Sequence, residues 1–153
     1  MTENNPYGSR PELLPGFMND HHFGEGRRVV KLGLKESREL EAVSLNRFPP
    51  TATAALGWAA GSYDERRWWD DEEGWAEVAA ELLSSFVMGE KHVAVFWGNL
   101  VMPTVTLPAR TAVERARELL DAGPHFWIYP LGGSILIECL LDGQVTVATI
   151  PGT

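Results

Sequence analysis

The clearest helical pattern in the chain lies at residues 72–88. Apolar residues recur there at intervals of three and four positions, which is the spacing of one face of an α-helix. The residues of this face are Trp75, Val78, Ala79, Leu82, Leu83, Phe86 and Val87. Asp70 is suited to cap the first turn together with Glu73, and Gly89 is suited to end the helix. The pattern predicts an amphipathic helix that packs its apolar face on a core.

Short β-rich runs follow this helix. Residues 92–97 and 100–106 are separated by Gly98 and Asn99, a pair that favours the positive φ angles of a tight hairpin. Three further runs, at 125–130, 134–140 and 144–150, are separated by Gly132-Gly133 and by Asp142-Gly143. The sequence therefore predicts a hairpin and, after it, a three-strand meander.

A second helix is predicted between the hairpin and the meander. Pro108 stands near its start, Thr111 and Glu114 have the spacing of a capping box, and Gly123 and Pro124 end the pattern. Because antiparallel neighbours need only short turns, this order of elements predicts an α+β fold with a mostly antiparallel sheet. We expect the two main helices to pack on one face of that sheet.

The first part of the chain is less periodic. Residues 1–26 contain scattered Pro, Gly and Asn residues and predict an irregular N-terminal arm. Residues 27–35 favour a strand, and residues 36–44 favour a short helix. We therefore expect an arm at 1–26 followed by a single α+β domain at 27–153.

Composition and charge narrow the class of protein. With 44% apolar and 22% charged residues, the sequence is typical of a globular domain. Its formal net charge of −8 argues against nucleic acid as a ligand, because phosphate binding depends on clustered Lys and Arg. The sequence has neither a signal-peptide pattern nor an apolar run of the roughly 20 residues that span a membrane. Cys139 is the only cysteine, which excludes an intramolecular disulfide. We expect a cytoplasmic protein.

Candidate catalytic and metal-binding residues form no recognisable motif. Asp20, His21 and His22 are adjacent in sequence, but adjacent side chains rarely converge on one ion. His92 and His125 lie far from them, and the His-Glu-x-x-His spacing of zinc proteases is missing. We therefore expect no catalytic centre, no metal site and no cofactor.

Two further residues have reactive side chains. Cys139 stands in an apolar run where a small buried residue fits, so we expect an inert thiol. In a strand, Glu138 points to the opposite face from Ile137 and Cys139, and we expect it to be exposed or paired.

Tryptophan and acidic residues are concentrated between residues 63 and 75. This segment holds three Trp, six acidic residues and two Arg. Trp, Tyr and Arg are common anchors at protein interfaces, and an acidic field attracts a cationic partner. The predicted partner-binding residues are Tyr63, Asp64, Glu65, Trp68, Trp69, Asp70, Asp71, Glu72 and Glu73. The alternative is a loop whose Trp side chains cover the sheet edge while the acids cap the following helix.

Basic residues are concentrated in a different segment. Six of the thirteen positive charges lie within residues 27–47. They are Arg27, Arg28, Lys31, Lys35, Arg38 and Arg47. This segregation is consistent with an internal match between the two segments, with a self-complementary dimer, or with two partner faces. The internal match is favoured because it needs no partner.

These features favour a small acidic binding protein. Our main hypothesis is an immunity-type inhibitor that neutralises a cognate bacterial toxin, because such a protein needs small size, stability without cofactors and a surface complementary to a basic enzyme domain. A second hypothesis is a small-molecule-binding domain or enzyme with a pocket between the sheet and the N-terminal arm, which uses His21, His22 or His125 with Tyr129. A third is a homo-oligomer, a homodimer for example, built on the exposed edge of the meander.

Overall fold

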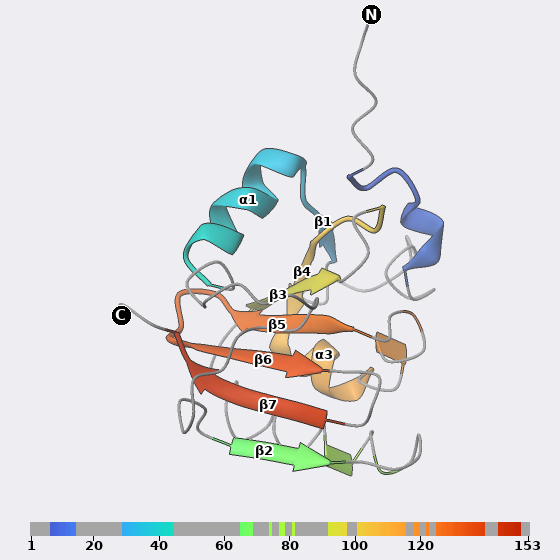
Figure 1. Ribbon diagram of the computed structural model, residues 1–153. Helices are drawn as coiled ribbons and strands as arrows, with labels where there is room; N and C mark the ends of the chain where they lie inside the picture. Colours follow the sequence, from blue (N-terminus) through green and yellow to red (C-terminus); the bar gives the residue numbers. More distant parts are fainter. Residues whose placement is uncertain are drawn as a thin grey trace, which may run out of the picture.

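The computed structural model describes residues 7–14, 29–44, 65–68, 74, 77–78, 81, 92–97, 101–115, 118–119, 122, 125–139 and 144–150. Within this part of the chain, seven strands form one sheet in the order β1-β4-β3-β5-β6-β7-β2 (Figure 1). The strands are β1 (Val30–Lys31), β2 (Glu65–Trp68), β3 (His92–Trp97), β4 (Val105–Pro108), β5 (Phe126–Pro130), β6 (Ile135–Cys139) and β7 (Gln144–Thr149). The helices are the 3-10 helix η1 (Pro11–Leu13), α1 (Leu34–Ala42) and α3 (Ala109–Glu114).

Every strand pair in the sheet is antiparallel. The predicted meander is present as β5, β6 and β7, joined in sequence and adjacent in the sheet. Gly132, between β5 and β6, has a φ angle of 75°, which explains the glycine in that turn. The predicted α+β class with a mostly antiparallel sheet is therefore confirmed.

The sheet buries apolar residues on both of its faces. The first face carries the larger core, whose largest fully buried side chains include Phe126, Leu107 and Ile137. The second face carries a smaller core with Phe96, Trp127, Tyr129 and Leu136. Because successive strand residues point to opposite faces, a strand that is buried on both faces needs apolar residues at nearly every position. This explains the continuous run Val93 to Trp97 in β3.

The helices cover both faces of the sheet. Ala109 and Ala112 of α3 belong to the first core, together with Val78 from the predicted helix at 72–88, whose described residues are all helical. Leu40 of α1 packs instead against the core of the second face. The prediction of two main helices on one face is only loosely confirmed, because the helix at 72–88 is described at only four residues and α3 covers only Ala109–Glu114.

The start of β4 differs from the prediction. Val95 of β3 pairs with Val105, so the tight turn at Gly98 and Asn99 and a strand beginning at residue 100 are both wrong. Residues 101–104 instead bind the N-terminal segment and the residues that precede α1, and Pro103 has no N–H group for a sheet ladder. The later start of β4 follows from those contacts.

The predicted capping box of the second helix is also wrong. Helix α3 begins earlier, with Pro108 as its N-cap and no side-chain capping bond. Thr111 therefore lies inside the helix and is buried, and its hydroxyl has no hydrogen-bond partner within the described residues. The predicted end of this helix at Gly123 and Pro124 lies outside the described residues.

Part of the predicted N-terminal arm is docked on the sheet. The Tyr7 hydroxyl donates to the Leu32 carbonyl at 2.7 Å and accepts from the Thr104 N–H at 2.9 Å. The Arg10 N–H donates to the Val101 carbonyl at 2.8 Å. Leu14 is 4% exposed and belongs to the first core. The predicted boundary at residues 26 and 27 lies outside the described residues.

The strand expected after the arm is shorter than predicted, and the helix after it begins earlier than predicted. Strand β1 covers only Val30–Lys31 of the predicted strand at 27–35, and α1 begins at Leu34 rather than at residue 36. A buried hydrogen bond of 2.6 Å joins the hydroxyls of Ser37 in α1 and Thr104, which precedes β4. This bond fixes the N-terminal half of α1 to the sheet. No helix in the described chain is long and apolar enough to cross a membrane.

Candidate functional site

The predicted partner-binding segment forms one edge of the sheet. Glu65 to Trp68 is strand β2, which pairs with β7 through Glu65 opposite Val147 and Trp68 opposite Gln144. Strand β2 stands last in the sheet order, so within the described chain its other side pairs with no strand (Figure 1). The sequence pattern did not predict this strand, because Glu-Arg-Arg-Trp has no alternation of apolar and polar residues.

The other predicted members of this site lie outside the described residues. They are Tyr63, Asp64, Trp69, Asp70, Asp71, Glu72 and Glu73. They flank β2 directly in the chain. The structure therefore places the backbone of Glu65 to Trp68, in the middle of the predicted site, at the sheet edge. The contacts of the site with a partner remain a proposal.

The described strands of the basic and acidic segments lie at opposite edges of the sheet. Strand β1, which carries Lys31, and strand β2, which carries Glu65, are the two opposite edges of the seven-stranded sheet. With a spacing of about 4.8 Å between neighbouring strands, six spacings separate these edges by roughly 29 Å. The predicted internal match therefore does not join β1 to β2, and for the rest of the two segments it stays a prediction.

A buried polar cluster lies on the second face of the sheet. Glu138 in β6 is 0% exposed, and its carboxylate accepts a hydrogen bond of 2.9 Å from the indole N–H of Trp127. The His125 Nε2 atom lies 3.4 Å from the same carboxylate oxygen. The rings of His125 and Trp127 are in contact, with centroids 4.3 Å apart. The sequence predicts that Glu138 is either exposed or paired. In the structure it is buried and paired.

This cluster belongs to a cross-strand row that ends on strand β2. The residues of the row, in order across the sheet, are Phe96, Trp127, Glu138, Thr146 and Arg66. Thr146, between Glu138 and Arg66, is fully buried. The buried carboxylate of Glu138 is tolerated only because hydrogen bonds replace its hydration. Trp127 and His125 provide such bonds. The Trp127–Glu138 hydrogen bond thus adds a side-chain link between β5 and β6.

Cys139 is the inert thiol that the sequence predicts. Its side chain is 2% exposed on the first face. Burial raises the pKa of the Cys139 thiol well above its usual range, and the charge of the neighbouring Glu138 adds to this effect. The structure therefore gives this thiol neither the access nor the thiolate that a nucleophile needs.

A labelling experiment checks this assignment. The native protein is expected to react with a thiol reagent at pH 8 more than about a hundredfold more slowly than the unfolded protein, because reaction requires opening of the core. The unfolded protein in guanidinium chloride should take up one equivalent. Rapid stoichiometric labelling of the native protein would show that Cys139 is accessible.

Of the three histidines named in the second hypothesis, the structure describes only His125. His21 and His22 lie outside the described residues. His125 and Tyr129 stand on either side of Trp127 on the second face, and Tyr129 is buried in the core of that face. In the described part of the chain, no group of three or more His, Cys, Asp or Glu side chains could hold a metal ion.

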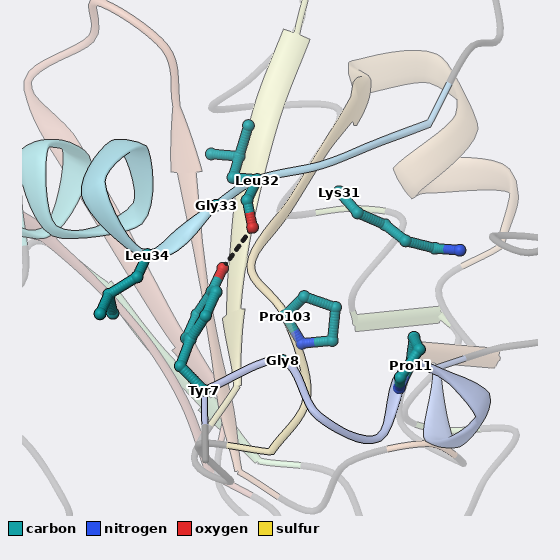
Figure 2. Close-up of a pocket in the computed structure, with 8 residues that line it drawn as sticks. All are labelled: Tyr7, Gly8, Pro11, Lys31, Leu32, Gly33, Leu34 and Pro103. Carbon is teal, nitrogen blue, oxygen red and sulfur yellow. Dashed lines mark hydrogen bonds between the residues drawn. The ribbon is translucent and has the colours of Figure 1, made fainter. Parts of the chain in front are cut away.

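A pocket lies between the N-terminal segment and the sheet, where the second hypothesis expects one. Its lining residues differ from those that the hypothesis names. Its volume is about 420 Å³, and its walls include Tyr7, Pro11, Lys31, Leu32, Leu34 and Pro103 (Figure 2). His125 and Tyr129 do not line it. The sequence signal for this site was weak, because Tyr7 and Pro103 are distant in the chain and lie in irregular segments.

Comparison with known proteins gives no further guide. No protein-family model matches the chain, and no curated protein shows significant similarity to it.

Proposed function

We propose that the chain is a bacterial cytoplasmic binding protein of the immunity type, which inhibits a cognate toxin through the segment 63–73. In this proposal Trp68 and Trp69 insert into the cleft of the toxin domain. The acidic residues around them take the place of the negative charge of the toxin's substrate. The partner is a basic toxin or enzyme domain.

The observation that carries the proposal is the position of β2. An edge strand offers backbone N–H and C=O groups to a partner chain, in addition to its side chains. In this protein, the edge strand holds Glu65 and Trp68 of the predicted site, and the remaining site residues flank it in the chain. The most charged and Trp-rich segment of the sequence therefore coincides with an edge of the sheet.

Charge supports the same proposal. The segment 63–73 contains six acidic residues and two Arg, and it includes the edge opposite to the one that carries Lys31. A cationic protein that approaches the molecule is therefore attracted more strongly to the β2 edge than to the β1 edge. Such steering increases the association rate more than it increases the equilibrium affinity.

A charge-neutralised variant tests this surface. The substitutions Asp64→Asn, Glu65→Gln, Asp70→Asn, Asp71→Asn, Glu72→Gln and Glu73→Gln are expected to slow association with the purified toxin domain by about 10- to 1000-fold at low salt. The proposal expects this toxin domain to be encoded directly beside the gene for this chain. Stopped-flow fluorescence at several salt concentrations measures the association rate.

Two matched variants provide the control. Asp64→Asn/Glu65→Gln removes two carboxylates from the proposed site, and Glu12→Gln/Glu39→Gln removes two exposed carboxylates elsewhere. Only the first pair is expected to slow association. Equal rates for both pairs, together with an unchanged salt dependence for the six-fold variant, would rule out this surface as the acidic site. Light scattering on the free protein separates this proposal from a homo-oligomer built on β2.

A further inference from the structure

We infer that the pocket between the N-terminal segment and β1 binds a small molecule with an apolar body and one carboxylate. The pocket lies near the β1 edge, opposite to β2, so this site is independent of the proposed inhibitor surface. Its volume of about 420 Å³ lies within the range of pockets that hold small ligands.

The walls of the pocket are largely apolar. Tyr7 and Pro11 contribute from the N-terminal segment, Leu32 and Leu34 from the residues around β1, and Pro103 from the segment before β4 (Figure 2). Gly8 has a φ angle of 68°, and a Cβ atom at Gly8 would lie 3.3 Å from the Pro103 Cβ. The glycine thus permits the close approach that forms this wall. An apolar ligand body fits these surroundings.

Most polar groups of the wall are already paired within the protein. The Tyr7 hydroxyl bonds both the Leu32 carbonyl and the Thr104 N–H. The Leu32 N–H donates to the Thr104 carbonyl at 2.8 Å, and the Gly33 N–H donates to the Glu36 carboxylate at 2.8 Å. These groups therefore contribute shape to the site, and little hydrogen-bonding capacity for a ligand.

Lys31 supplies the charge that selects the ligand. Its side chain lines the pocket on the same side as Pro11 (Figure 2) and, within the described chain, forms no hydrogen bond or ion pair. An ammonium group next to an apolar wall favours a carboxylate attached to an apolar body. The Glu36 carboxylate, which lies beside Gly33, disfavours a second negative charge. The expected ligand class is therefore a monocarboxylate.

Titration with three small probes, followed by amide shifts in NMR spectra, tests this site. The probes are benzoate, its neutral analogue benzamide, and the dicarboxylate terephthalate. Benzoate is expected to bind about 3- to 10-fold more tightly than benzamide and than terephthalate, with shifts centred on Gly8, Leu32 and Gly33. The size of this preference reflects an exposed ammonium group.

Two lysine variants decide whether Lys31 is responsible. In Lys31→Met the preference for benzoate over benzamide should disappear, while weak binding of both probes remains because the apolar walls are intact. In Lys35→Met, which removes an exposed charge on α1 outside the pocket, the preference should be unchanged. The inference is overturned if no probe binds saturably, if the shifts map elsewhere, or if Lys31→Met retains the preference.

Discussion

Replacement of Glu138 by alanine is expected to lower the free energy of unfolding by about 2–4 kcal/mol. The variant leaves the buried indole N–H of Trp127 without the acceptor that lies 2.9 Å away, and it creates a cavity on the second face of the sheet. An unsatisfied buried donor alone costs about 1–3 kcal/mol. Chemical denaturation followed by Trp fluorescence measures the change.

Conservative variants separate the hydrogen bond from the cavity. Glu138→Gln keeps the volume and one acceptor, so it should cost about 1 kcal/mol or less. The double variant Glu138→Leu/Trp127→Phe removes both partners, and it should be less destabilised than the sum of its single variants. If Glu138→Ala unfolds within about 0.5 kcal/mol of the parent protein, the cluster does not stabilise the sheet.

Loss of either Trp68 or Trp69 is expected to weaken binding of the toxin domain by about 2–4 kcal/mol, or roughly 30- to 1000-fold in Kd. Buried aromatic anchors account for most of the binding energy in typical interfaces. Trp97 and Trp127, in contrast, are buried in the two cores of the sheet. Val43→Ala is the matched control, because Val43 is an exposed apolar residue at the C-cap of α1. It should bind like the parent protein.

The strands of the second half of the chain could be predicted because their signals are local. Strand β3 is observed at His92–Trp97, where the sequence predicts it, and β5, β6 and β7 differ from their predicted ranges by at most one residue at each end. Apolar runs and turn residues such as Gly132 determine these elements without reference to distant segments. The position of β4 could not be predicted in this way. It depends on Pro103 and on contacts with the N-terminal segment.

The candidate sites were harder to predict, because they depend on neighbours that are distant in sequence. Strand β2 is polar, and it is a strand because its backbone pairs with β7, which follows it by more than seventy positions. Strand alternation correctly places Glu138 opposite to Cys139, but it does not reveal that both faces of the sheet are buried. The pocket at Tyr7 and Lys31 likewise requires segments that meet only in the fold.

We propose that the segment 63–73, which includes the edge strand β2, binds the partner. Isothermal titration calorimetry of the parent protein, Trp68→Ala, Trp69→Ala and Val43→Ala with the purified toxin domain tests it most directly. Thermal unfolding first confirms that each variant is folded. We predict that the two Trp variants lose roughly 30- to 1000-fold in affinity while Val43→Ala is unchanged. Equal affinity for all four proteins would contradict the account.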